Sequence, residues 1–246
     1  MTQHTKCIFY FAYFGDEQEC LSTVIDRYTY IASQLQYLSN LCDENNIQQR
    51  FLVATIPDKL HSALFYMARE YKFNICHQFT SNENSFEYPG IAACTSFAKQ
   101  NPSAIIYYCH SKGSVNRTKL SMGIFKHHCS INLAYNLDEF ISAHDKYKAG
   151  LFPSEYGWLW HNFFWVKASY LMNKEVQKSP RRHYYESFIG EQTYRNTLAH
   201  KNVMSTLPDS FFIEQSQLSK KDFYEATNIN QCAFLNSEYR RLGEKT

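Results

Sequence analysis

The chain lacks any run of about 20 apolar residues, the length that a helix needs to cross a lipid bilayer. Its first residues, Met1 to Cys7, also lack the apolar stretch of a secretory signal peptide. Its eight cysteines are scattered, with no C-x-x-C pair and no zinc-finger spacing. A chain of 246 residues without a disulfide framework is typical of a reducing compartment. We therefore expect a cytoplasmic location and no transmembrane segment, with peripheral membrane contact left open.

The chain also lacks a large excess of charge of either sign. The 25 basic and 23 acidic residues give a formal net charge of +2, whereas nucleic-acid binding usually shows a basic stripe. Residues 181–183 and 220–221 form only local basic clusters, which are more typical of solvated faces. We expect no nucleic-acid partner.

Several catalytic motifs are absent as well. The chain has no G-x-S-x-G elbow, no H-E-x-x-H and no Walker loop. His127 and His128 could join His110 in a metal site only through tertiary folding, which leaves a hydrolase as a weak alternative.

Apolar runs and helical periodicity alternate along the first hundred or so residues. We expect strands at 7–14, 50–56, 73–79 and 104–109, and helices at 20–45, at 59–71 and from Tyr88 onward. This order is typical of βαβ units joined by right-handed crossovers, which predicts an α/β fold with a mainly parallel sheet.

The second half is less regular. The pattern predicts helices at 120–135, 137–144 and 182–196 and a strand at 147–152, and residues 158–166 are strongly aromatic. Because no repeat, low-complexity tract or Gly/Ser linker divides the chain, we expect a single domain over residues 1–246. It would comprise halves at 5–115 and 116–210 and a polar tail at 211–246.

The segment from Ala104 to Ser114 is the most informative. An apolar, strand-like run is followed by an imidazole, a hydroxyl, an ammonium and a glycine, from His110, Ser111, Lys112 and Gly113. In an open α/β sheet, ligands bind at the carboxyl ends of the strands. Lys112 offers a point charge, and Gly113 lets backbone N–H groups approach a phosphate. A polar turn that merely closes the strand explains the same residues equally well.

Residues 157–165 contain all three tryptophans of the chain. Aromatic faces pack against the C–H faces of sugar rings, and a neighbouring Asn or His can bond hydroxyls, so this segment is a candidate sugar site. The alternative is a buried aromatic strand. Strand alternation would place Trp158, Trp160, Asn162 and Phe164 on one face, and Leu159, His161, Phe163 and Trp165 on the other.

Two carboxylates, Glu186 and Glu191, lie five residues apart near the end of this half. On an ideal helix they are separated by roughly 140°, so they do not share a face. A single carboxylate at a pocket edge is what an alcohol-activating general base requires. A solvated helix glutamate is the alternative.

Taken in order, three blocks resemble one family: residues 105–113, residues 161–165 with Lys167 and Tyr170, and residues 186–190. They are similar to bacterial and viral glycosyltransferases of surface-polysaccharide and rhamnan synthesis. Those sequences show a strand followed by His-Thr-Lys-Gly, later Gly-Asn-Phe-Trp-Trp, then Glu-x-Trp-Ile-Gly. The Glu-Tyr-Pro-Gly segment at 87–90 also matches, and the similarity spans roughly residues 5–196.

The resemblance implies a GT-A-like fold and a hexosyl- or deoxyhexosyltransferase of polysaccharide, lipopolysaccharide or glycan synthesis. A nucleoside-diphosphate sugar would lie in the first half and a saccharide acceptor in the second. Donor-binding residues implied in this way are His110, Ser111, Lys112, Gly113 and Tyr13, and acceptor-binding residues are Trp160, His161 and Asn162. Glu186 would be the catalytic base, with Asp138 and Glu191 as weaker candidates.

The chain departs from the family pattern in two respects. Many GT-A enzymes bind a divalent metal, Mn²⁺ or Mg²⁺, through an Asp-x-Asp motif, and this sequence has none. His110 to Lys112 stand at that point, so dependence on a metal is left open, and Lys112 could supply the positive charge instead. In the acceptor-side motifs, His161 stands where the family has Gly, and Phe164 and Ser187 stand where it has Trp. A non-catalytic nucleotide- or carbohydrate-binding module is therefore the alternative function.

Overall fold

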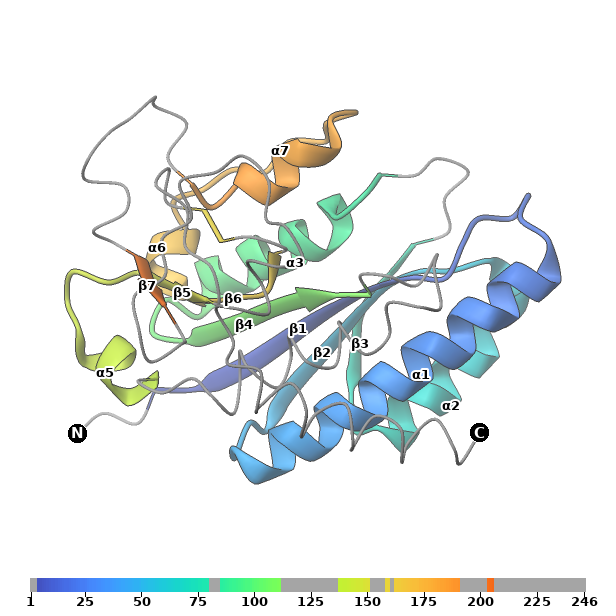
Figure 1. The fold of residues 1–246 in the computed structure, drawn as a ribbon, viewed down its shortest axis with the longest axis horizontal. Helices are drawn as coiled ribbons and strands as arrows, with labels where there is room; N and C mark the ends of the chain where they lie inside the picture. Colours follow the sequence, from blue (N-terminus) through green and yellow to red (C-terminus); the bar gives the residue numbers. More distant parts are fainter. Residues whose placement is uncertain are drawn as a thin grey trace, which may run out of the picture.

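The computed structural model describes residues 4–79, 85–111, 137–150, 158–159, 162–190 and 203–205. These residues form a mixed seven-stranded sheet in the order β3-β2-β1-β4-β6-β5-β7, with helices on both faces (Figure 1). None of the helices in the described ranges combines the length and apolarity that a bilayer crossing requires.

The first part of the chain confirms the expected alternation. Its elements are β1 (Lys6–Tyr13), α1 (Leu21–Glu44), β2 (Gln49–Thr55), the 3-10 turn η1 (Asp58–Leu60), α2 (His61–Glu70), β3 (Asn74–Phe79), α3 (Tyr88–Gln100) and β4 (Ile105–His110). The pairs β1–β2, β1–β4 and β2–β3 are all parallel, as predicted.

In the second part of the chain, fewer strand pairs are parallel than expected. It contains α5 (Leu137–Ser142), β5 (Lys148–Gly150), β6 (Phe164–Lys167), α6 (Ala168–Leu171), α7 (Arg182–Ser187) and β7 (Val203–Ser205). β6 is antiparallel to both β4 and β5, whereas β5 and β7 are parallel. The helix predicted at 120–135 lies outside the described residues, as do residues 191–196 of the one predicted from 182.

A single buried strand over residues 158–166, the alternative to a sugar site in this segment, is not what the structure contains. β6 begins only at Phe164, because Asn162 adopts a left-handed backbone with φ of 55° that interrupts an extended chain. The predicted alternation therefore fails across Asn162. Leu159 packs in the same core layer as Phe164, whereas Phe163 and Trp165 lie in the opposite layer.

The core consists of two layers, one on each face of the sheet. Alternate residues of β1, such as Tyr10 and Phe9, point into opposite layers and are buried in both. The helices α1 and α2 cover one face, and α3, α6 and α7 lie over the other (Figure 1). Covering on both faces explains why the central strands are apolar throughout.

The strand order creates a topological switch point. The chain adds β2 and then β3 on one side of β1, and β4 on the other side. The strand order therefore changes direction between β1 and β4, and ligands of such sheets bind at the carboxyl ends of the strands at a point of this kind. The start of α3 lies close to this edge, since a Cβ on Gly90 would be 2.6 Å from Phe11 Cβ and 2.8 Å from the Tyr108 hydroxyl.

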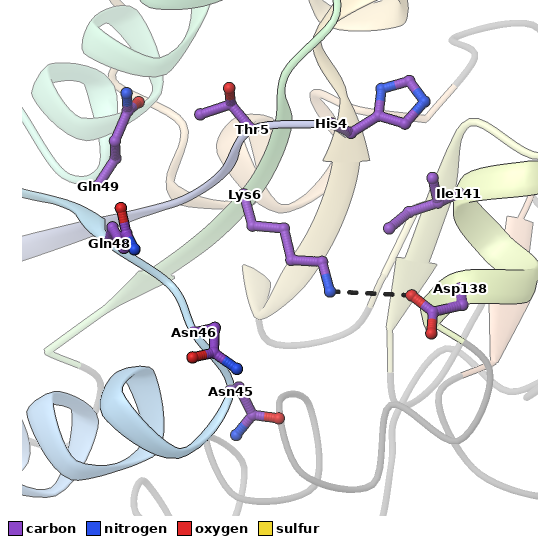
Figure 2. A pocket seen from close by; sticks show the side chains of 9 residues that line it. All are labelled: His4, Thr5, Lys6, Asn45, Asn46, Gln48, Gln49, Asp138 and Ile141. Carbon is purple, nitrogen blue, oxygen red and sulfur yellow. Dashed lines mark ion pairs between the residues drawn. The ribbon is translucent and has the colours of Figure 1, made fainter. Parts of the chain in front are cut away.

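At the opposite, amino-terminal edge of the sheet, α5 lies beside the start of β1. Lys6 Nζ is 3.8 Å from a carboxylate oxygen of Asp138, whose side chain is 98% exposed (Figure 2). The turn from α1 to β2 faces the same edge.

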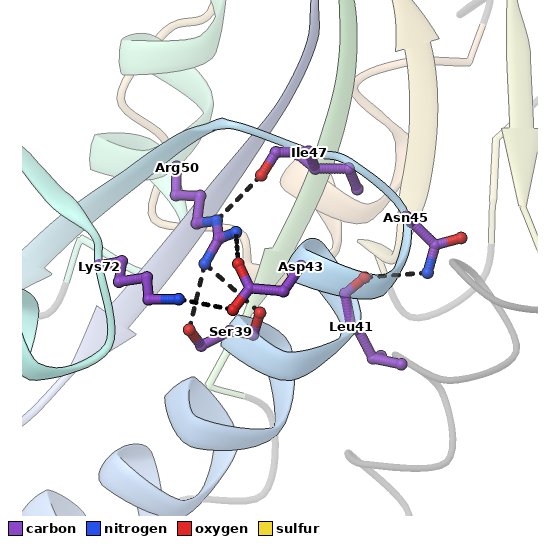
Figure 3. Close-up of polar contacts among 7 residues, drawn as sticks. All are labelled: Ser39, Leu41, Asp43, Asn45, Ile47, Arg50 and Lys72. Carbon is purple, nitrogen blue, oxygen red and sulfur yellow. Dashed lines mark hydrogen bonds and ion pairs between the residues drawn. The ribbon is translucent and has the colours of Figure 1, made fainter.

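A polar network holds the turn between α1 and β2 (Figure 3). Arg50 is buried, donates to the Ile47 carbonyl at 2.9 Å and to Ser39 Oγ at 3.1 Å, and pairs with Asp43. Lys72 Nζ donates to the other Asp43 oxygen at 2.7 Å. This arrangement joins the ends of α1 and α2 to the start of β2.

We expect this network to make stability depend on pH. Hydrogen bonds from Lys72, and then from Arg50, lower the pKa of Asp43 from 3.8 to about 2. A depressed carboxyl pKa contributes stability above the unfolded pKa that is lost as pH falls towards the folded one. Between pH 4 and pH 2, the melting temperature of the native chain should therefore fall more steeply than that of Asp43→Asn. Equal slopes of melting temperature against pH would show that Asp43 does not contribute.

Candidate functional site

The ends of β1 and β4 meet at the switch point through Ser111. Its backbone N–H donates to the Phe11 carbonyl at 2.8 Å, which extends the parallel pairing by one residue. Its hydroxyl oxygen accepts a hydrogen bond from the backbone N–H of Tyr13 at 3.1 Å. The structure thus brings together Tyr13, His110 and Ser111, three of the predicted donor-binding residues.

Glu87, which begins the Glu-Tyr-Pro-Gly segment but was given no role from the sequence, lies next to these residues. Glu87 immediately precedes α3, and its Oε2 accepts from the Tyr108 hydroxyl at 3.2 Å and from Asn162 Nδ2 at 2.9 Å. Its Oε1 lies 3.6 Å from His110 Nε2, and the two side chains are only 15% and 13% exposed. One acidic group therefore joins α3, β4 and the segment before β6.

Electrostatics keep the Tyr108 hydroxyl a hydrogen-bond donor. Burial, and then the neighbouring negative charge of Glu87, raise the pKa of Tyr108 well above its ordinary value of 10.0. The hydroxyl therefore stays protonated at neutral pH and donates to Glu87.

Asn162 combines two costly features. It is fully buried with a left-handed backbone, and its Oδ1 has no hydrogen-bond partner in the described part of the chain. An unpaired buried acceptor costs about 1–3 kcal/mol, and strained backbone gathers at functional sites. The amide group that was predicted to contact a sugar donates from its Nδ2 to Glu87 in the structure.

At the end of β1, Tyr13 belongs to a second cluster. Its hydroxyl donates to Glu19 Oε1 at 3.0 Å, and the other oxygen of Glu19 lies 2.5 Å from Arg27 Nη1. The Arg27 guanidinium is 5.2 Å from the centre of the Tyr13 ring, and Arg27 Nη1 is 3.0 Å from where a Cβ on Gly15 would lie. Gly15, with φ of +128°, provides the space that this buried arginine needs.

The hydroxyl of Tyr13 is not suited to proton transfer. Burial, followed by the hydrogen bond to Glu19, raises the pKa of Tyr13 to about 12. Burial alone would raise the pKa of Glu19, but hydrogen bonds from Arg27 and Tyr13 lower it overall. The hydrogen bond to Glu19 holds the Tyr13 side chain in place. Tyr13 can therefore contribute its aromatic ring and backbone groups to the site, but not a proton.

The described part of the site does not resemble a cation site. No group of three or more His, Cys, Asp or Glu side chains lies close enough to hold a metal within the described ranges. Glu87 and His110 supply two donor groups, but Glu87 already accepts hydrogen bonds from Tyr108 and Asn162. We therefore derive no catalytic step through Mn²⁺ or Mg²⁺.

The remaining predicted site residues are distributed as follows. Lys112, Gly113, Trp160, His161 and Glu191 lie outside the described residues. The backbone of Glu186 is in α7, and its side chain is outside the description. The neighbouring Tyr185 packs on Phe86, with ring centres 6.5 Å apart, so α7 reaches the end of α3 that carries Glu87.

Asp138, the weaker candidate for the base, lies at the other edge of the sheet. β1 has eight residues between Lys6 and Tyr13, so at ~3.3 Å per residue its ends are ~23 Å apart. Because Asp138 pairs with Lys6, it is not brought together with His110 and Ser111.

No protein-family model matches the chain, and no curated protein sequence is significantly similar to it. The chemistry of the site itself is therefore the basis on which a function can be assigned.

Proposed function

We propose that the protein is a glycosyltransferase that moves a sugar from a nucleoside-diphosphate donor to a saccharide hydroxyl. The observation that carries this proposal is the switch point of the sheet, where Tyr13 ends β1, His110 ends β4 and Ser111 directly follows β4. Dinucleotides and mononucleotides bind at this point in open α/β sheets, because the diverging connections leave room above the strand ends.

In this proposal the donor diphosphate lies over the end of β4. Ser111 and His110 supply polar groups there, and Lys112 follows directly with a positive charge. That charge stabilises the diphosphate as it leaves the sugar carbon, which is the step where negative charge develops. Glu87 holds Tyr108 and Asn162 in place beneath these groups.

The acceptor hydroxyl must lose a proton as it attacks. A carboxylate within hydrogen-bond reach accomplishes this, and we assign the role to Glu186. The contact between Tyr185 and Phe86 supports this assignment, because it brings the helix that carries Glu186 towards the same end of α3.

Release of nucleoside diphosphate tests the proposal. The protein is incubated with UDP-, GDP- and dTDP-sugars and a mixture of saccharide acceptors, with and without Mn²⁺, and the released nucleoside diphosphate is measured. We expect one donor to give release that increases with acceptor. No release together with no binding of any of the three nucleoside diphosphates would refute it.

The second candidate is a binding module that has retained the fold without turnover, and the missing Asp-x-Asp motif favours it. Tight donor binding in calorimetry, with neither transfer nor slow hydrolysis in any acceptor mixture, would select this function.

Replacing Lys112 by Ala is expected to weaken nucleoside-diphosphate binding by ~1.5–3 kcal/mol, the contribution of a hydrogen bond to a charged group. The measurement is the dissociation constant by titration calorimetry. Lys99→Ala is the matched control, because Lys99 is an exposed lysine near the far end of α3. A folded Lys112→Ala variant with the native dissociation constant would remove Lys112 from the phosphate site.

A further inference from the structure

A polar hollow lies at the amino-terminal edge of the sheet, away from the proposed donor site (Figure 2). It has a volume of about 740 Å³ and is open to solvent on one side. Its walls come from the start of β1, the turn between α1 and β2, and α5. The volume lies within the ~300–1,000 Å³ that is usual for small-ligand sites.

The lining is dominated by neutral side chains that both donate and accept hydrogen bonds. Four carboxamides come from five consecutive positions of the turn, Asn45, Asn46, Gln48 and Gln49. Each carboxamide carries two N–H donors and one carbonyl acceptor. The charged groups of the described lining, Lys6 and Asp138, form an ion pair across the hollow, so their charges offset each other.

The wall that carries the carboxamides is held in one conformation. At the end of α1, Ile47 N–H donates to the Cys42 carbonyl at 2.8 Å and Asn46 N–H to the Asp43 carbonyl at 3.4 Å. With Asn46 left-handed at φ of 55°, these bonds form a Schellman motif. Arg50 binds the Ile47 carbonyl from inside the network of Figure 3. Little ordering is therefore required of the backbone when a ligand binds.

We infer that this hollow binds a neutral oligosaccharide. Each sugar hydroxyl can both donate and accept a hydrogen bond, and each carboxamide offers N–H donors beside a carbonyl acceptor, so the two kinds of group are complementary. An uncharged ligand also suits a lining whose charges are paired. The described lining has neither the basic excess that a nucleic acid requires nor the aromatic and arginine anchors of protein interfaces. This site is separate from the proposed donor site and does not depend on it, because it lies at the other end of β1.

The test is a titration followed by NMR of the side-chain amide groups of asparagine and glutamine. The full chain is titrated with maltotriose, cellotriose and mannotriose as neutral probes, and with trigalacturonate as the charged comparator. We expect at least one neutral trisaccharide to shift the resonances of Asn46, Gln48 and Gln49 in a saturable way. Trigalacturonate should bind more weakly.

Two variants keep the inference falsifiable. Both the double change Gln48→Ala with Gln49→Ala and the single change Asn46→Gly, which keeps the left-handed backbone accessible, should weaken binding at least about tenfold. Gln36→Ala, at an exposed position of α1 outside the hollow, should not change it. The inference is overturned if no neutral trisaccharide shifts these resonances, if trigalacturonate binds more tightly, or if the variants bind as the native chain does.

Discussion

Replacing Glu186 by Gln is expected to lower turnover by roughly 10²–10⁴-fold, the usual contribution of general base catalysis. The change preserves the shape of the side chain and removes the oxygen that accepts the proton from the acceptor hydroxyl. Glu186 is the last residue but one of α7, which spans Arg182–Ser187. The measurement is the rate of nucleoside-diphosphate release at saturating donor, with the donor dissociation constant determined in parallel.

Donor binding should be unaffected, because Glu186 is assigned to the acceptor side. Glu175→Gln is the matched control, since Glu175 is an exposed glutamate before α7. A Glu186→Gln variant that retains near-native turnover would show that the base lies elsewhere, or that the transfer is retaining and requires no base at this position.

Replacing Glu87 by Ala is expected to lower the free energy of unfolding by ~2–4 kcal/mol, since two buried donors lose their charged acceptor. These donors are the Tyr108 hydroxyl and the Asn162 amide group, which lie 3.2 Å and 2.9 Å from Glu87 Oε2. Glu87 makes no side-chain capping bond to α3, so the loss does not come from the helix end. Urea denaturation gives the free energy directly.

The conservative variant separates the hydrogen bonds from the volume of the side chain. Glu87→Gln keeps one carbonyl oxygen as acceptor, and it should lose less than half as much stability as the Ala variant. If Glu87→Ala unfolds at the same urea concentration as the native chain, the bridge between α3, β4 and Asn162 does not stabilise the fold.

The first half of the fold could be predicted because local periodicity determines it. The apolar run at 105–110 and the helical spacing of α1 can be recognised from neighbouring residues alone. Strands and helices that alternate in this way are joined by right-handed crossovers, which make the strands parallel. Because the site lies where strands end, the positions of His110 and Ser111 followed from the same pattern.

The features that could not be predicted depend on residues that lie far apart in the sequence. Glu87 and Asn162 are 75 positions apart, and no local signal marks their hydrogen bond. The aromatic run at 158–166 reads as one strand, because nothing in its apolar pattern encodes the left-handed turn at Asn162. The short helix α6 and the strand β7 also went unpredicted. Four-residue and three-residue elements of this kind are formed by tertiary packing rather than by periodicity.

We propose that a nucleoside diphosphate binds at the carboxyl ends of β1 and β4. Backbone amide resonances, mapped while UDP, GDP or dTDP is added, would locate this binding. We expect saturable shifts at Tyr13, His110 and Ser111 with at least one of the three nucleotides, and little change at Lys6 or Gln49 at the other edge. Shifts confined to the amino-terminal edge, or none with any nucleotide, would contradict it.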